Sequence, residues 1–430
     1  MARLLLLMTT QTYKAEAFLA AARWLGVHVV VGSEQPQALA ALNPDGNLTL
    51  PFQSPEEATR RVLAYAATRP LDAVVAADDD GTVLAAEAAR ALGLLHNPVE
   101  AVRTACDKLA TRSALRAAGL AVPHFARWGL HEDPHEIARR TAYPCVLKPL
   151  HLSGSRGVIR ANHPEEFVGA FARLKAILHG PEVTAGPQWI LVEDFIPGQE
   201  VALEGLLERG SLRTLALFDK PDPLDGPYFQ ETIYVTPSRH PAPVQEALVH
   251  ATQRALRAIG LQHGPVHAEL RFGSGIWFLE AAPRSIGGLC SRALRFGGGE
   301  VSLEGLLLRH ALGLGTGDLE RERCAAGVMM IPIPKPGILR GVHGLDAARE
   351  VPDVEDVRIT MPRGQRVQPP PEGARYLGFI FARSTTAAAV EQALRASHAH
   401  IALDIEPEEA TVPVRQVGPD GGAEARESRR

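Results

Sequence analysis

The segment 263–288, HGPVHAELRFGSGIWFLEAAPRSIGG, holds charged residues whose spacing suggests chemistry. Two runs of β-prone residues flank Ser274-Gly275, which predicts a β-hairpin. The first run alternates, with Val266, Ala268, Leu270 and Phe272 on one side and His267, Glu269 and Arg271 on the other. With a two-residue loop, Glu269 would lie directly opposite Glu280. Because like charges opposed across two strands are destabilising, this pair favours a bound hard cation such as Mg²⁺.

Lysine is rare in this chain, with six residues against 39 arginines, so we expect a lysine to mark a position that arginine cannot fill. Lys108 stands at the start of a predicted helix, where a cation opposes the helix dipole and a bound phosphate would reverse the sign. A solvated surface lysine is an equal alternative. Lys148 ends a predicted strand before the loop SGSRG (153–157), whose glycines permit the close backbone approach that phosphate oxygens need. This loop is not of the Walker type, and a plain hairpin turn is the alternative.

Residues 189–200, WILVEDFIPGQE, predict a strand, a short linker and a second strand. Such a linker suits purine binding, with Glu200, seven residues after Glu193, placed to hold ribose hydroxyls. An ordinary hairpin with charged ends is the alternative. Asp78-Asp79-Asp80 follows the apolar run 71–76, at a strand end where ligands bind in open α/β sheets. For these aspartates we favour a cap on the following helix over a substrate or interface loop.

The elements that must position these residues follow from the apolar patterns. Residues 1–100 alternate between strand-like runs (3–8, 27–31, 71–76) and helices (around 55–69 and 81–93), which predicts a parallel sheet with helices on both faces. Further helices are predicted at 164–178 and 241–260, and a pair of helices on either side of Gly297–Gly299. Short strands and one helix from about 325 predict a small α+β domain, and the polar tail 413–430 is expected to be disordered.

The bulk composition excludes several classes of protein. The chain has 430 residues, 46% of them apolar, and a net charge of −4, which gives no basic field for nucleic acid. No apolar run approaches the length of a membrane span, and the Leu4–Leu7 run is better explained as a strand than as a signal peptide. The four cysteines lack metal-ligand spacing, and reduced thiols in a cytoplasmic protein are expected. No G-x-G-x-x-G follows the first strand, which argues against a dinucleotide site.

In their order along the chain, the lysines, the glycine-rich loop, the EDFIPGQE linker and the hairpin carboxylates resemble the ATP-grasp superfamily, specifically its carboxylate–amine ligases. The resemblance covers roughly residues 1–410 and implies an α/β and α+β protein of the ATP-grasp fold. The expected parts are an N-terminal Rossmann-like pre-ATP-grasp domain (1–100), an ATP-grasp domain (101–320) with a lid subdomain at about 120–190, and a small C-terminal α+β domain (321–412). The last resembles that of L-amino acid ligases and biotin-carboxylase-like enzymes.

The resemblance also implies roles for individual residues. Binding of the nucleotide is expected from Lys108, Lys148, Ser153, Gly154, Ser155, Gly157, Glu193, Asp194, Phe195, Ile196, Glu200 and Lys220. Glu269 and Glu280 correspond to the magnesium ligands, and Arg284 to the arginine that stabilises phosphoryl transfer and the acyl-phosphate. His267 and Arg271 could contact the substrate carboxylate or an acyl-phosphate oxygen; an ion pair with Glu280 or its neighbours is the alternative. One departure is Ala282, which stands where the family often has an Asn in E-I-N-P-R.

The function that the resemblance implies uses ATP and Mg²⁺, with Mn²⁺ as a second option. The γ-phosphoryl group would pass to a small-molecule carboxylate, and an amine would displace phosphate from the acyl-phosphate to leave an amide. The alternatives are a biotin-carboxylase-like carboxylating enzyme and an ATP-binding protein without ligase activity. A homodimer is compatible with the resemblance, and neither a nucleic acid nor a membrane partner is expected.

Overall fold

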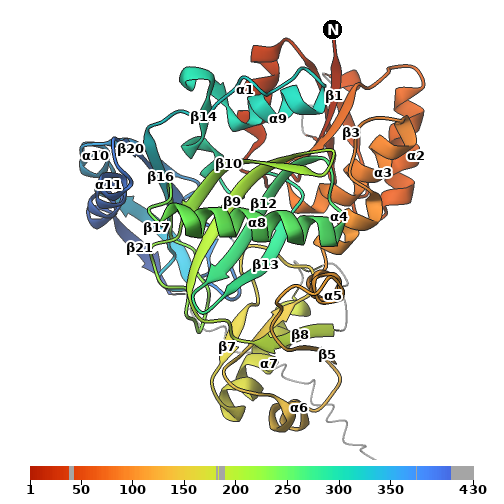
Figure 1. The fold of residues 1–430 in the computed structure, drawn as a ribbon. Helices are drawn as coiled ribbons and strands as arrows, with labels where there is room; N and C mark the ends of the chain where they lie inside the picture. Colours follow the sequence, from red (N-terminus) through yellow and green to blue (C-terminus); the bar gives the residue numbers. More distant parts are fainter. Residues whose placement is uncertain (38–42, 181–182, 184–188, 374, 408–430) are drawn as a thin grey trace, which may run out of the picture.

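The computed structural model describes residues 1–407 apart from 38–42, 181–182, 184–188 and 374 (Figure 1). The tail predicted at 413–430 lies outside the described residues. The first sheet has the order β3-β2-β1-β4 and is parallel, as predicted. Its strands are β1 (Arg3–Leu7), β2 (His28–Ser33), β3 (Asn47–Thr49) and β4 (Ala73–Ala76), with helices α1 (Ala15–Leu25), α2 (Pro55–Ala66) and α3 (Thr82–Leu92).

The leucine run of β1 is buried on both faces of this sheet. Leu4 and Leu6 pack into one hydrophobic core, and Leu5 and Leu7 pack into another. A strand covered on both sides needs no polar residue at alternate positions, which explains the continuous apolar run. The core of Leu4 and Leu6 also holds Ala77 and residues of the central sheet, so it places the carboxyl end of β4 beside the rest of the molecule.

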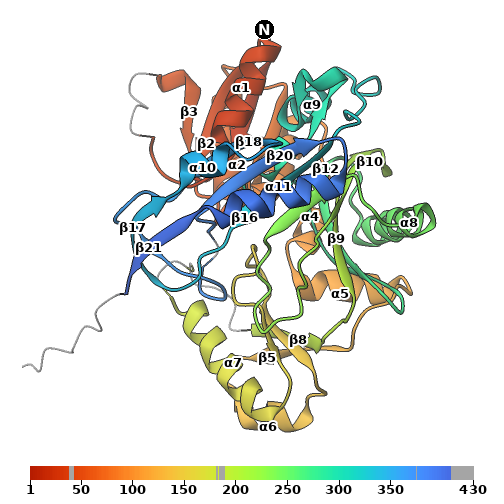
Figure 2. The same ribbon diagram turned by 90° about the vertical axis from the view of Figure 1, so that its left-hand side faces the viewer.

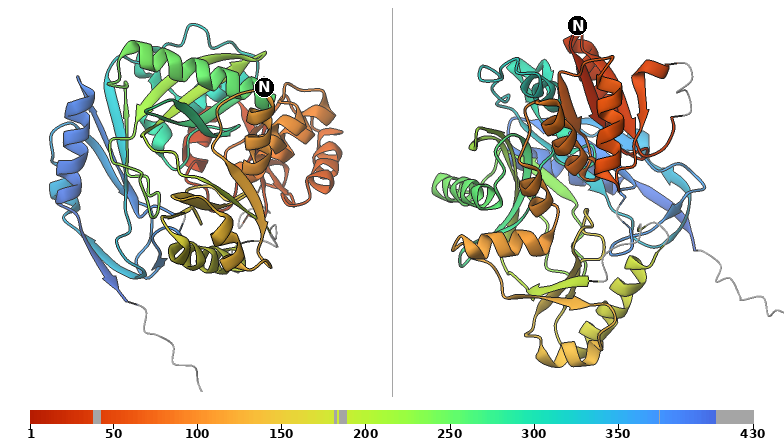
Figure 3. Two further views of the ribbon diagram at one scale, coloured as in Figure 1. Left: turned by 60° about the horizontal axis from the view of Figure 1, so that its bottom comes forward. Right: turned by 90° about the vertical axis from the view of Figure 1, so that its right-hand side faces the viewer.

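A second sheet of order β5-β8-β6-β7 projects away from the first (Figures 2 and 3). It follows α4 (Val99–Ala105) and α5 (Lys108–Ala117). Its elements are β5 (Phe125–Gly129), α6 (Pro134–Arg140), β6 (Cys145–Pro149), β7 (Ile159–Ala161), α7 (Pro164–Leu178) and β8 (Trp189–Asp194). Buried Phe167, Phe171 and Leu174 of α7 pack on this sheet.

The central sheet has eight antiparallel strands in the order β13-β12-β9-β10-β11-β16-β20-β18. The strands are β9 (Gln199–Glu208), β10 (Ser211–Asp219), β11 (Ile233–Thr236), β12 (Gly264–Phe272), β13 (Ile276–Ala282), β16 (Ala325–Ile331), β18 (Val354–Ile359) and β20 (Gly378–Ser384). The amphipathic helix α8 (Ala242–Ile259) buries Leu248, Ala255 and Leu256 in one core with β12.

The C-terminal strands are divided between two sheets, which the sequence pattern does not reveal. Strands β16, β20 and β18 extend the central sheet, whereas β17 (Gly337–His343), β19 (Arg366–Val367) and β21 (Ala402–Glu406) form a separate one. Helices α10 (Leu345–Arg349) and α11 (Ala387–Ala399) belong to this part of the chain, and α11 lies along β16 and β20 (Figure 2).

The prediction of two helices around Gly297–Gly299 is wrong for the first of them. Residues Cys290–Ala293 form only a 3₁₀ turn, and β14 (Arg295–Phe296) then pairs with β15 (Val301–Ser302). The three glycines between these strands have φ values of 57°, 76° and 100°, a left-handed backbone that ends any helix. The second helix is present as α9 (Leu303–Ala311).

Candidate active site

Glu269 and Glu280 lie directly opposite each other on β12 and β13, as the alternation predicts. The connecting loop is not the predicted two residues, because Phe272 pairs with Ile276 and leaves three residues between the strands. A β-bulge between Glu269 and Leu270 shifts the pairing by one residue, which restores the opposition of the glutamates.

Each of the two opposed carboxylates has a different lysine. An oxygen of Glu269 lies 3.1 Å from Lys220 Nζ, and an oxygen of Glu280 lies 3.6 Å from Lys108 Nζ. Burial raises the pKa of Glu269, whereas Lys108 and then Lys148 lower the pKa of Glu280 against the opposing effect of burial. Paired oxygen ligands of this kind suit a hard divalent cation, so the residues fit the metal that the sequence predicts.

Lys220 lies among three carboxylates. Its Nζ is 2.8 Å from Glu200, 2.6 Å from Glu231 and 3.1 Å from Glu269, and burial of the lysine is outweighed by these charges, which raise its pKa. Oxygens of the three glutamates lie within 4.8 Å of one another. Lys220, expected to bind the nucleotide, therefore holds a carboxylate cluster together. Glu231 is a member that the sequence did not single out.

Glu193 is held by two cations rather than left free beside the linker. Arg112 donates to both its carboxylate oxygens, at 2.9 and 3.1 Å, and Lys148 donates to one of them. Although burial alone would raise the pKa of Glu193, Arg112 and Lys148 lower it to about 2. Both oxygens of Glu193 are thus occupied by these cations, and the geometry does not support the predicted contact of Glu193 with the nucleotide. This side chain positions Lys148, which enters the site from β6.

The linker after β8 forms one wall of a slot. The Phe195 ring packs against Phe229 at 6.4 Å between centroids, and Arg271 donates to the Ile196 carbonyl at 2.7 Å. Arg271 also donates to Glu200 at 2.9 Å. An ion pair was the predicted alternative for Arg271, but the partner is Glu200 rather than Glu280. Through these two contacts the arginine positions the linker.

The slot is apolar at one end and charged at the other. It is lined by Lys108, Val146, Lys148, Leu152, Ser153, Gly154, Ser155, Val158, Glu193, Asp194, Phe195, Ile196, Glu200, Phe229, Glu269, Arg271, Leu279 and Glu280. Both lysines and the glycine-rich loop lie at the charged end. Lys108 Nζ donates to the Leu152 carbonyl at 2.7 Å. Gly154 and Ser155 have φ values of 63° and 55°, a backbone turn that suits anion binding.

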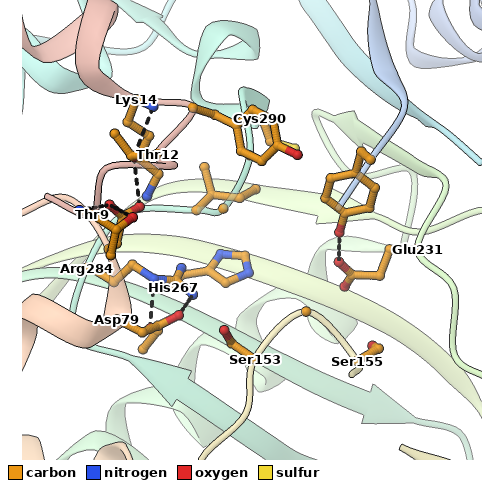
Figure 4. Close-up of a pocket in the computed structure, with 18 of the residues that line it drawn as sticks. Thr9, Thr12, Lys14, Asp79, Ser153, Ser155, Glu231, His267, Arg284 and Cys290 are labelled. Atoms are coloured by element: carbon orange, nitrogen blue, oxygen red, sulfur yellow. Dashed lines mark hydrogen bonds and ion pairs between the residues drawn. The ribbon is translucent and has the colours of Figure 1, made fainter. Parts of the chain in front are cut away.

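A second cavity of about 250 Å³, here called the central cavity, opens beside the hairpin (Figure 4). Its walls include Thr9, Thr12, Lys14, Asp79, Ser153, Ser155, Glu231, Tyr234, His267, Glu269, Glu280, Ala282, Arg284, Ile286, Cys290 and Tyr376. They come from the first sheet, the second sheet and the central sheet. The cavity is therefore built between parts of the chain that are distant in sequence.

Arg284 is paired with Asp79 across this cavity wall (Figure 4). Its Nε and Nη2 donate to the two carboxylate oxygens at 2.9 and 2.6 Å, and Asp79 raises the arginine pKa against burial. Asp78 accepts from Thr9 and Thr12. No side chain caps the turn Asp79–Gly81 or helix α3, so the favoured capping interpretation is wrong and the interface alternative is the one observed.

His267 faces the central cavity and is held between two glutamates. Its Nδ1 lies 3.2 Å from Glu204 and its Nε2 lies 3.6 Å from Glu269. Burial lowers the imidazole pKa, but the two carboxylates prevail and raise it to about 9. The predicted contact with neighbouring acidic groups is thus present, and the imidazolium adds a positive charge beside Glu269.

Lys14 is a buried member of the cavity wall that the sequence analysis missed. Its Nζ donates to the Ala77 carbonyl at 2.8 Å, the Ser285 carbonyl at 3.0 Å and Ser285 Oγ at 3.2 Å. Burial, followed by the charge of Arg284, lowers its pKa to about 8. The rarity of lysine was the signal that could have identified this residue.

A third cavity of about 300 Å³, the side cavity, shares Arg284 and Asp79 with the central cavity. Phe52, Val83, Ala105, Cys106 and Pro283 give it apolar walls, and Lys108, His151, Asp79 and Asp80 add polar and charged groups. Ser153 and Glu280 line the slot, the central cavity and the side cavity alike. The slot and the two cavities therefore meet at the Glu280 carboxylate and at Ser153 of the glycine-rich loop.

Comparisons with known proteins cover most of the chain. Family models described as ATP-grasp N-terminal domain, ATP-grasp domain and L-amino acid ligase C-terminal domain 2 match residues 19–95, 141–293 and 329–406. The solved L-amino acid ligase from Bacillus licheniformis superposes with a TM-score of 0.80 at 25% identity, covering 94% of this chain and 99% of that one.

Two curated relatives extend the comparison. The alanine–anticapsin ligase of Bacillus amyloliquefaciens is 25% identical over 54% of this chain and 52% of its own length. Carnosine synthase 1 of Gallus gallus is 31% identical over 61% of this chain and 30% of its own length. The chain thus spans about half or less of these two relatives. Among the described residues, no helix has the length and apolar character that a membrane crossing requires.

Proposed function

We propose that this chain, an ATP-grasp protein, is a ligase that activates a small-molecule carboxylate with ATP and joins it to an amine. The observation that carries the proposal is the meeting of three spaces at Ser153 and Glu280. A two-substrate ligase needs such an arrangement, because the phosphoryl donor, the carboxylate and the amine must reach one point. The similarity to an L-amino acid ligase supports the same reaction.

The slot is assigned to ATP. Its apolar end, lined by Val146, Phe195 and Phe229, suits the adenine ring, and Glu200 at its edge suits ribose hydroxyls. Lys108 and Lys148 lie at the other end beside the glycine-rich loop and would offset phosphate charge. Glu269 and Glu280 would hold Mg²⁺ or Mn²⁺, which when bound would offset further phosphate charge and help to orient the transferring group.

The proposed reaction has two steps. A substrate carboxylate oxygen forms a bond to the γ-phosphorus while the bond to the β–γ bridging oxygen breaks and ADP leaves. The amine nitrogen then bonds to the acyl carbon, phosphate departs with the bonding electrons, and the nitrogen loses a proton to solvent. Positioning and charge stabilisation supply most of the catalysis in such transfers. Arg284, held in place by Asp79, and the lysines supply positive charge at the meeting point.

The two remaining cavities are assigned to the two substrates. The central cavity borders both Glu269 and Glu280, so the carboxylate that accepts the phosphoryl group is placed there. The side cavity borders only Glu280 of this pair, and it shares Ser153 and Arg284 with the central cavity. It is assigned to the amine. Phe52 and Val83 in its walls favour an amine with an apolar side chain.

The test is ADP release in a panel of carboxylates and amines, with the product mass determined. Release that requires one carboxylate and one amine together, with loss of one water from their summed mass, is expected. Glu280→Ala should abolish this release and change the melting temperature little, because its side chain is 43% exposed. Turnover that depends on bicarbonate and biotin would establish the carboxylating alternative, and ATP binding without turnover would establish a binding protein.

Three expectations from the sequence stay predictions alongside this proposal. They are the homodimer, the cytoplasmic location and the division into domains at residues 100, 320 and 412. The described part of the lid prediction, 120–190, corresponds to the second sheet with α6 and α7. Sedimentation of the purified chain measures the first of these directly.

A further inference from the structure

The segment before β20 reaches across the molecule to the glycine-rich loop. The Gly157 amide, at the end of SGSRG, donates to the Pro371 carbonyl at 2.8 Å. Gly157 has a φ of 73°, and a Cβ there would lie 2.8 Å from Leu174, so only glycine suits this close-packed turn. Residues of the loop that line the slot and both cavities are thus tied to a chain segment more than 200 residues later.

A second contact joins the same two parts. Arg173 on α7 donates through Nε and Nη2 to the two carboxylate oxygens of Glu372, at 2.5 and 2.8 Å. The planar guanidinium matches a carboxylate in this two-bond geometry, which fixes orientation as well as distance. The hydrogen bond is the main cause that raises the pKa of Arg173 and lowers that of Glu372. Both groups are charged at neutral pH.

A third segment, residues 225–228, also contacts Arg173. Its guanidinium lies 4.7 Å from the centre of the Tyr228 ring and donates to the Tyr228 hydroxyl. The neighbouring strand β7 is held by the same loop, because the Arg160 amide donates to the Pro227 carbonyl at 2.9 Å and Ile159 forms a bridge with Tyr228. The second sheet is therefore fastened both to residues 225–228 and to residues 371–372.

We propose that Arg173 and Glu372 are positioning residues that fasten the glycine-rich loop over the triphosphate end of the slot. This inference rests on the proposed function, since it names the phosphates of ATP as the group that the loop covers. Loss of the ion pair leaves the hydrogen bond from Gly157 to Pro371 as the remaining direct contact described here, and the fraction of molecules in which the loop is fastened becomes smaller. The apparent affinity for Mg·ATP falls by that fraction.

The experiment compares Arg173→Met and Glu372→Gln with Arg139→Met. Arg139 forms an exposed ion pair with Glu136 inside the second sheet's own helix α6, so its loss leaves the loop fastened. The half-exposed Arg173–Glu372 contact predicts a rise of about fivefold in KM for ATP, with kcat changed less than twofold. The double variant R173E/E372R, which restores the pair with reversed charge, should recover most of the loss.

Hydrogen exchange supplies a readout that needs no turnover. The Gly157 amide, protected by Pro371, should exchange faster in Arg173→Met and Glu372→Gln than in the wild type and Arg139→Met. Calorimetric titration with Mg·ATP should show the same fivefold weakening. Equal exchange and equal ATP affinity in Arg173→Met and Arg139→Met would overturn the inference. If the wild type forms no product with any substrate pair, the proposed ligase function fails, while exchange and ATP affinity still decide whether the fastening exists.

Discussion

Arg112→Met is expected to destabilise the protein strongly, because it leaves the Glu193 carboxylate buried with one partner in place of two. Arg112 is 1% exposed and Glu193 4% exposed. The arginine donates to both Glu193 oxygens and to the Leu279 carbonyl at 2.6 Å, the residue before Glu280. The substitution therefore disturbs one of the two lysines at the slot as well as the strand that carries a proposed metal ligand.

The magnitude follows from the pKa of Glu193, which Arg112 and Lys148 lower from 4.5 to about 2 despite burial. That difference corresponds to roughly 3 kcal/mol in favour of the ionised form. Removal of one partner of a buried ion pair costs about 3–5 kcal/mol in comparable cases. A loss of about 3 kcal/mol at pH 7 is expected. This contribution is present above pH 4.5 and is lost as the pH falls toward 2.

Thermal unfolding followed by circular dichroism measures the effect. Arg112→Met should lower the melting temperature by about 5 °C or more at pH 7, and the gap to the wild type should narrow below pH 4.5. Arg61→Met, which removes an exposed pair with Glu57, is the matched control and should change it by less than about 1 °C. A similar small change in both variants at pH 7 would refute the reasoning about the buried pair.

Two further substitutions test the walls of the central cavity. His267 has a pKa of about 9, raised from 6.5 by Glu204 and Glu269, so its contribution to stability is complete below pH 6.5 and is lost as the pH rises through 9. Melting temperatures of His267→Asn should be less sensitive to pH in this window, and an imidazole NMR titration midpoint near 6.5 in the wild type would contradict the assignment. Lys14→Met should lower stability by about 1–3 kcal/mol in urea unfolding, because three acceptors lose their donor. Lys14→Arg should also be less stable than the wild type, because the larger guanidinium does not fit a site in which Lys14 is 3% exposed. Stability of Lys14→Arg equal to that of the wild type would contradict this.

Local patterns predicted the opposed glutamates and the strands of the first sheet except the short β3. The Leu4–Leu7 run and the alternation around Glu269 are short-range signals, and the β1 and β12 contacts agree with them. The bulge beside Leu270 has no such signal. The loop is one residue longer than predicted, and the bulge then shifts the strand register by one residue in the opposite sense. The two changes cancel, so Glu269 faces Glu280 as predicted although the predicted loop was wrong.

Long-range partners were beyond the sequence pattern. Arg284 was expected to face a phosphoryl group, but its pairing with Asp79 joins residues 205 positions apart. Lys220 stands among Glu200 of β9, Glu269 of β12 and Glu231 of the loop before β11, a set that only the folded chain brings together. Burial decides the chemistry of such groups, and no periodicity in one sequence shows which charged residues share a buried space.

The course of β16 determines how the chain can be divided. Ala326, Val328 and Met330 pack in a core shared with β1, while Ala325, Met329 and Ile331 pack in a core shared with α11. A boundary at residue 329, where the C-terminal family match begins, would cut this strand in two. Removal of the part beyond it would take away β20, which pairs with β16 on the side opposite β11, and would leave the buried remainder of β16 as a bare sheet edge prone to aggregation. The C-terminal part is therefore not an interchangeable cassette, and chimaeras between relatives need their junction ahead of Ala325.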